Sequence, residues 1–154
     1  MEALNLPAYT CKIKQSQNKF WIYDAIRKKY LVLTPEEWVR QHFINYLVQH
    51  LHFPKSLISS ERGTTYNTLA KRTDICVYDT AGEVRLLVEC KATTVKITED
   101  TVRQATTYNQ TVRAPYVVLT NGHEHYCWQV NFESKTTSPL TGIPEYSHFL
   151  KQQP

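Results

Sequence analysis

Three charged residues interrupt a stretch of sequence that otherwise has the composition of two buried β-strands. Asp74 lies in the first segment, TDICVYD, and Glu89 and Lys91 lie in the second, EVRLLVECKA. Charged side chains are almost never fully buried unless they are paired or bind a metal, because their desolvation costs several kcal/mol. These three positions therefore either face water or form a site.

The geometry of a β-hairpin is able to bring the three charges together. The sequence DTAGE between the two segments is typical of a turn, which indicates a hairpin that closes about Ala81. Side chains alternate along a strand, so Glu89 and Lys91 lie on one face. The hairpin puts Asp74 opposite Val88 or Glu89, and residues that are directly opposite have Cβ atoms about 5 Å apart. In one of these two registers, Asp74 and Glu89 are neighbours.

Two neighbouring carboxylates and a lysine suit the hydrolysis of phosphodiesters. The carboxylates repel each other unless they share a proton or bind a divalent cation. Mg²⁺ prefers oxygen ligands and keeps several waters, so Asp74, Glu89 and the backbone carbonyl of Cys90 would be enough to hold it, and Mn²⁺ would substitute. Such an ion lowers the pKa of a bound water and neutralises charge on a phosphate. Lys91 would orient that water or stabilise the developing charge.

A well-marked helix precedes these strands, in the segment LTPEEWVRQHFINYLVQHLHFP. Thr34 is a good N-cap, Pro35 suits the first helical position, and Glu37 completes a capping box. Pro54 marks the end of the helix. An acid at the start of this helix, Glu36 or Glu37, could complete the metal site. The apolar stripe of the helix is formed by Phe43, Leu47 and Leu51, widened by Val39, Ile44 and Val48.

The remaining segments predict an α/β (α+β) fold with a mixed central sheet flanked by helices. KSLISSER is expected to form a short strand, ITEDTVRQATTYNQTV a second helix capped at or near Thr98, and APYVVLT a buried strand. Asn121 and Gly122 are a two-residue hairpin signal, after which HEHYCWQV returns as one additional strand. The predicted order is helix, strand, strand, strand, helix, strand.

Composition is compatible with one domain over residues 1–154. The chain is 42% hydrophobic, with residues 1–19 and 132–154 expected to be peripheral apart from a short helix at 146–150. No apolar run reaches the roughly 18 residues of a membrane span, and there is no signal-peptide core, so a cytoplasmic location is expected. The four cysteines form no CxxC pair and are expected to be free thiols. A net charge of +4 is compatible with a polyanionic partner.

Asp74 followed by VECK, after a helix that carries glutamates, resembles the PD-(D/E)xK nuclease superfamily. The ordered segments LTPEEWVRQHFINYL, KRTDICVYD, LLVECKA, QATTYN and YVVLTNG are similar to the N-terminal nuclease domain of type I restriction enzyme R subunits, in a short stand-alone bacterial form. This resemblance spans roughly residues 20–146. It implies a restriction-endonuclease-like core of order αβββαβ and endonuclease-like, Mg²⁺-dependent hydrolysis of DNA.

The resemblance also assigns roles to individual residues. Asp74 and Glu89 would be metal ligands, and Lys91 the catalytic lysine. Gln104 and Tyr108 match a QxxxY element that supports the site and touches DNA in related nucleases.

The remaining assignments concern DNA binding and the acid on the first helix. Lys71 and Arg72, just before the hairpin, are expected to assist in DNA binding. The helix acid would be Glu36 or Glu37, and Glu36 is slightly favoured because the capping box already occupies Glu37.

Other readings and partners remain open at this stage. No GxxxxGK[ST] loop occurs in the sequence, so restriction activity would need other restriction-modification or helicase chains. A homodimer is also compatible with the sequence. The main alternative is a DNA-binding or assembly module with an inactive nuclease fold, and another is an interaction protein whose charge cluster is only structural.

Overall fold

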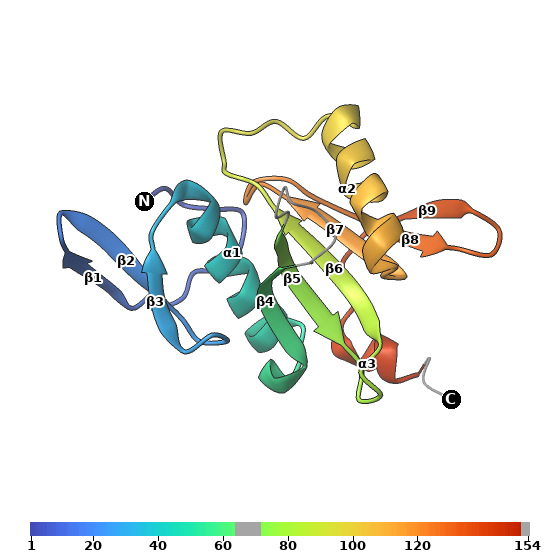
Figure 1. Ribbon diagram of the computed structural model, residues 1–154, viewed down its shortest axis with the longest axis horizontal. Coiled ribbons are helices and arrows are strands. Elements are labelled where there is room, and N and C mark those ends of the chain that lie inside the picture. Colours follow the sequence, from blue (N-terminus) through green and yellow to red (C-terminus); the bar gives the residue numbers. More distant parts are fainter. Residues whose placement is uncertain (64–71, 152–154) are drawn as a thin grey trace.

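The computed structural model describes residues 1–63 and 72–151, without the side chains of residues 61–63 and 72–74. It contains a three-stranded antiparallel sheet and a six-stranded mixed sheet, with helices packed on both faces of the larger sheet (Figure 1). The small sheet has the order β1 (Ile13–Ser16), β2 (Lys19–Asp24) and β3 (Lys29–Val32). The large sheet has the order β4 (Ile58–Gly63), β5 (Arg72–Tyr78), β6 (Val84–Cys90), β7 (Tyr116–Thr120), β8 (His125–Asn131) and β9 (Thr136–Leu140).

The predicted fold class is therefore confirmed. Strands β6 and β7 are parallel, and the other neighbours in the large sheet are antiparallel. The order α1, β4, β5, β6, α2, β7 matches the predicted core, and β8 is the predicted additional strand. The helical segments are α1 (Pro35–Asn45), the π-turn η1 (Tyr46–His50), the 3₁₀ turn η2 (Lys55–Leu57), α2 (Glu99–Val112) and α3 (Tyr146–Leu150).

Helix α1 begins where the sequence predicts. The Thr34 hydroxyl accepts a hydrogen bond from the Glu37 N–H at 3.0 Å, and Pro35 is in the first turn. The predicted apolar stripe is buried in the main core cluster. The helix does not continue regularly to Pro54, however, because its last turn widens into the π-turn η1.

Helices α1 and α2 cover opposite faces of the large sheet. Val39 and Phe43 of α1 share the main core cluster with Val88 of β6. Ala105 of α2 packs instead with Val117 of β7 and its neighbours. The central strands are thus buried on both faces, which explains their long apolar runs.

The hairpin of β5 and β6 has the predicted turn. The Asp79 carboxylate accepts hydrogen bonds from the N–H groups of Ala81, at 2.9 Å, and Glu83, at 3.0 Å. Gly82 adopts a φ of +85°, a conformation that residues with a Cβ rarely take. Local turn chemistry therefore closes this hairpin.

The turn between β7 and β8 differs from the prediction by one residue. The Asn121 N–H donates to the Glu124 carbonyl at 3.2 Å, so Gly122 and His123 are the two central residues, rather than Asn121 and Gly122. The Asn121 side chain accepts from the N–H groups of His123 and Glu124 and closes the turn. Gly122, with a φ of +89°, takes the first central position, as in a type II′ turn.

Residues 1–19, which were expected to be peripheral, contact the rest of the domain at several points. Leu4 and Leu6 pack on the main core cluster, and the Asn5 N–H donates to the Gly122 carbonyl at 2.8 Å. The β1–β2 turn uses Gln17 and Asn18 at φ values of 55° and 61°, without the glycine or proline that would have signalled it. The small sheet therefore had no strong local signature.

The C-terminal region contains one predicted and one unexpected element. Helix α3 has the predicted bounds. Strand β9 was not expected because it contains Pro139, which breaks most strands, but β9 is the last strand of its sheet, and proline is tolerated at an edge.

Two sequence-based expectations concern the environment of the chain. Within the described residues, no helix is both long enough and apolar enough to cross a membrane. All four cysteines are free, as expected, and all but the half-buried Cys11 are buried. Burial raises the pKa of the Cys127 thiol to about 11, which leaves it protonated at neutral pH.

Candidate active site at the end of strand β6

Glu89 and Lys91 form an ion pair at the end of β6. The Lys91 Nζ lies 3.2 Å from the Glu89 Oε1. The Glu89 side chain is 7% exposed, whereas that of Lys91 is 24% exposed. The Lys91 N–H also donates to the carbonyl of Thr120 at 2.8 Å, which fixes the backbone after β6 to the end of β7. The pair is firmly held but its cation still reaches solvent.

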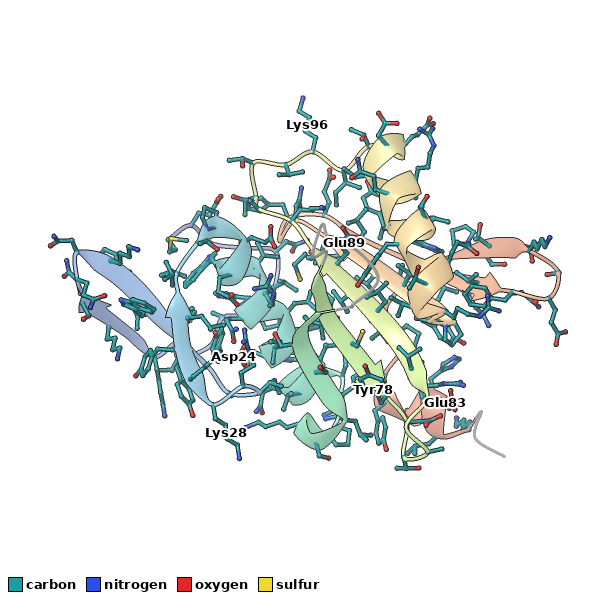
Figure 2. All side chains as sticks on the ribbon, in the orientation of Figure 1. Asp24, Lys28, Tyr78, Glu83, Glu89 and Lys96 are labelled. Carbon is teal, nitrogen blue, oxygen red and sulfur yellow. The ribbon has the colours of Figure 1, made fainter. Side chains whose placement is uncertain are left out.

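The pair lies on the face of the sheet that α2 covers. Val88 and Cys90 belong to the core cluster on the α1 face, whereas Leu87 belongs to a cluster that α2 contributes to. Side chains alternate between the two faces of a strand. Glu89 and Lys91 therefore point to the same face as Leu87, away from Val88 and Cys90. Figure 2 shows Glu89 near the end of the central sheet from which the β6–α2 loop departs.

Asp74 is the third member of the predicted triad, and the structure describes its backbone but not its side chain. Asp74 is part of β5, in which Ile75 pairs with Val88. If this pairing continues by one residue, position 74 lies opposite Glu89. The sequence had left open whether Asp74 lies opposite Val88 or opposite Glu89. The side chains of Asp74 and Arg72, and the whole of Lys71, lie outside the described residues, so their roles stay predictions.

The two residues of the predicted QxxxY element lie on α2. Tyr108 is half-buried and packs on the cluster that contains Cys76 and Leu87. Helix α2 connects two parallel strands, so it runs antiparallel to β6. Gln104, which is exposed, is one helical turn of about 6 Å nearer the end of β6 that carries Glu89.

The two helix acids have different environments. Glu37 is buried, with Arg40 Nη1 at 2.5 Å from Oε1 and Gln41 Nε2 at 2.8 Å from Oε2. The side chain of Glu36 is 46% exposed and contacts Arg40 Nη2 at 3.1 Å. The Thr34 hydroxyl accepts from the backbone N–H of Glu37, and the Glu37 carboxylate also binds Arg40 and Gln41, so the preference for Glu36 stays a prediction. Which acid serves the site stays open.

An open hollow joins the start of α1 to the end of β6. It has a volume of about 500 Å³ and is lined by Glu36, Glu37 and Arg40 on one side and by Ala92 on the other. Ala92 directly follows Lys91, but neither Glu89 nor Lys91 lines the hollow, and their side chains lie on the opposite face of the sheet. In Figure 1 the loop that leads from β6 to α2 passes close to the start of α1. The rest of its lining is Leu31, Val32, Thr34 and Pro35.

Glu2 is a neighbour of this region that the sequence did not indicate. Its carboxylate accepts a hydrogen bond from the Thr93 hydroxyl and contacts His123 Nε2 at 3.0 Å, and these two hydrogen bonds hold the pKa of Glu2 below its usual value. The carbonyl of Glu2 accepts from Trp38 Nε1 at 2.9 Å. The N-terminus thus joins the loop after Lys91 to α1.

Arg40 was also missed, although its spacing from the acids was visible. Positions three and four residues apart on a helix are neighbours, so Glu36 and Glu37 could have been paired with Arg40 from the sequence. No sequence signal marks Glu2, because its partners lie far along the chain. Among the described residues, which exclude the Asp74 side chain, no three His, Cys, Asp or Glu side chains are grouped so as to hold a metal.

The fold is an α+β domain with a mixed central sheet, and comparisons with known proteins identify its family. Residues 35–144 match the family described as type I restriction enzyme R protein N terminus, and the chain belongs to that family. A solved structure, the fragment of a putative HsdR subunit of a type I restriction enzyme from Vibrio vulnificus YJ016, is similar in fold with a TM-score of 0.54 at 16% identity. The similarity covers 78% of this chain and 25% of that one. No curated protein gave a match.

Proposed function

We propose that this domain hydrolyses phosphodiester bonds of DNA in a reaction that depends on Mg²⁺, as the nuclease part of a type I restriction system. The observation that carries the proposal is the Glu89–Lys91 pair, a nearly buried carboxylate 3.2 Å from a cation that still reaches solvent. Membership of the R protein family supports the same conclusion. Other chains of the restriction system would supply DNA translocation and sequence recognition.

The residues at the end of β6 fit a magnesium ion by the chemistry of their donors. Asp74, Glu89 and the Cys90 carbonyl offer only oxygen ligands, which Mg²⁺ prefers. When bound there, the ion would lower the pKa of a water ligand and neutralise charge on the phosphate.

Lys91 is the side chain that we expect to act on the reacting groups. The Lys91 ammonium donates hydrogen bonds to the attacking water or to a phosphate oxygen, where negative charge increases in the transition state. The water oxygen forms a bond to phosphorus and releases a proton to solvent, one P–O ester bond breaks, and the leaving alkoxide takes up a proton from solvent. The neighbouring Glu89 carboxylate, 3.2 Å away, holds the ammonium in place.

Calorimetric titration of Mn²⁺ tests the metal site without knowledge of the substrate. We expect binding to the wild-type protein and none to Asp74→Ala, while Glu133→Ala, a change of an exposed acid in the β8–β9 turn, serves as the matched control and keeps binding. Equal binding to all three proteins would contradict the assigned ligands. A parallel assay follows nicking of plasmid DNA with Mg²⁺ and with EDTA. Metal binding without any cleavage would favour the alternative, a DNA-binding or assembly module with an inactive nuclease fold.

A further inference from the structure

A second hollow, of about 390 Å³, lies between the small sheet and the later half of α1. Its volume is within the range of roughly 300–1,000 Å³ that is typical of small-molecule sites. It is separate from the hollow beside Ala92, with which it shares no lining residue. In Figure 2, Lys28, which lines the second hollow, lies well away from Glu89. Its other lining residues are Tyr9, Thr10, Lys12, Tyr23, Ala25, Gln41, Ile44, Asn45, Val48, Gln49 and Lys55.

The charge of this hollow has a single sign. Lys12, Lys28 and Lys55 come from three different segments and line it together, and no acidic residue is among the lining residues. Lys28 and Lys55 are exposed and make no ion pair within the described part of the chain. The nearest acid in the sequence, Asp24, is fully buried, and its Oδ1 accepts hydrogen bonds from the N–H groups of Ile26 and Arg27. Asp24 and Glu37 act electrostatically on the lining residue Tyr9, but both are buried and hydrogen-bonded and neither lines the hollow. The three lysines that do line it favour an anion such as a phosphate.

The wall of the hollow offers a row of amides. Gln41, Asn45 and Gln49 are spaced four residues apart along α1 and its continuation, and all three line the hollow. Gln41 is 3% exposed and donates through Nε2 to Glu37. The side chains of Asn45 and Gln49 make no hydrogen bond within the described residues. Side-chain amides both donate and accept, as the edges of nucleobases do.

Aromatic rings complete the lining. Tyr9 and Tyr23 both line the hollow, and the Lys12 Nζ lies 5.3 Å from the centre of the Tyr23 ring. Tyrosine rings are surfaces on which nucleobases stack, and an adjacent lysine reaches the phosphate of the same nucleotide.

From these three features we infer that the hollow binds a nucleoside phosphate, with the base toward the amides and rings and the phosphate toward the lysines. An inorganic anion would contact the lysines but would make no contact that uses the amides and the aromatic rings. The ligand is either a free nucleotide or one nucleotide of a strand. This inference does not depend on DNA cleavage.

The test is calorimetry in EDTA with four probes: deoxyadenosine monophosphate, a 12-nucleotide single-stranded DNA, deoxyadenosine and inorganic phosphate. We expect saturable binding of the monophosphate or of the oligonucleotide, and much weaker binding of deoxyadenosine and phosphate. Binding of the monophosphate would identify a site for free nucleotides, and binding of the oligonucleotide alone would identify a site for a strand.

Variants locate the binding in this hollow. Lys28→Gln/Lys55→Gln and, separately, Asn45→Leu should each weaken it at least tenfold, whereas Lys135→Gln/Lys151→Gln, which removes the same charge elsewhere, should change it less than twofold. Both lysines of the first variant are exposed, so this variant keeps the fold even if Asn45→Leu does not.

Three results would overturn the inference: no saturable binding of either nucleotide probe, phosphate binding as tightly as the monophosphate, or equal loss in the hollow variant and its charge control. The titrations are made in EDTA, so they measure binding without any Mg²⁺-dependent cleavage. Failure of cleavage and failure of this site are therefore observed independently.

Discussion

Two acid–base pairs, Glu89–Lys91 on β6 and Glu37–Arg40 on α1, differ in how closed they are. Arg40 is held 2.5 Å from Glu37, with both side chains 5% exposed, and its guanidinium also contacts Glu36. Lys91 lies 3.2 Å from Glu89, and its side chain is 24% exposed. The arginine thus serves two acids at once, whereas the lysine has room for another partner.

This difference in exposure indicates which of the two cations is able to contact a substrate. A guanidinium that is fixed by two carboxylates is a rigid structural element, and breaking a buried pair leaves an uncompensated charge. A lysine ammonium is a point charge on a flexible stem, and solvent access lets it meet a phosphate. We therefore expect variants of the first pair to act mainly on stability and variants of the second mainly on activity.

The largest effect is expected for Lys91→Ala. Cleavage should fall by about 10²–10³-fold, since a donor that stabilises transition-state charge is removed. Plasmid nicking measures the rate, and circular dichroism should show an unchanged fold. Lys96→Ala, in the same loop but exposed, is the matched control and should keep the wild-type rate. Full activity of Lys91→Ala would remove the lysine from the mechanism.

The next effect, on stability, is expected for Arg40→Met. The free energy of unfolding in urea should fall by about 3 kcal/mol, because the buried Glu37 loses its cation. Arg103→Met breaks an exposed pair with Asp100, whose side chains are 70% and 77% exposed, and should cost less than about 1 kcal/mol. Similar losses in both variants would show that the Glu37–Arg40 pair is no more structural than a surface pair.

A smaller effect should separate the two helix acids. Glu37→Gln should lower the free energy of unfolding by about 1–3 kcal/mol, because charge-assisted hydrogen bonds to Arg40 and Gln41 are weakened. Glu36→Gln should cost less than about 1 kcal/mol, since that side chain is half-exposed. Rates of plasmid nicking by the same two proteins show which acid serves the site. A larger loss of stability in Glu36→Gln would contradict the burial argument.

The smallest effect concerns pH. Burial lowers the pKa of His42, whose ring lies against Trp38. Below a pH of about 6.5 the unfolded chain therefore binds a proton that the folded chain resists, and stability falls as the pH drops through that value. The urea midpoint should drop less between pH 7.5 and 5.5 in His42→Gln than in the wild type. The exposed His50→Gln should behave as the wild type, and identical pH dependence in all three proteins would refute the effect.

Local signals predicted much of the fold. The caps at Thr34 and Thr98, the turn at Asp79 and the alternation of β6 depend on residues within a few positions of one another, and the structure has all of them. The small sheet was missed because its strands are short and its turns lack glycine. Its two hairpins pair residues that are close in sequence, but neither turn contains the glycine that marked the β5–β6 turn.

The sequence by itself determined that Glu89 and Lys91 share one face of a strand, because side-chain alternation is a property of the extended backbone. Only the tertiary structure decided the register opposite Glu89, the burial of Glu37 rather than Glu36, and the meeting of α1 with Ala92. These features depend on how helices and strands pack across long separations in sequence. The distances between the side chains of the candidate site are therefore set by tertiary packing and not by the local structure.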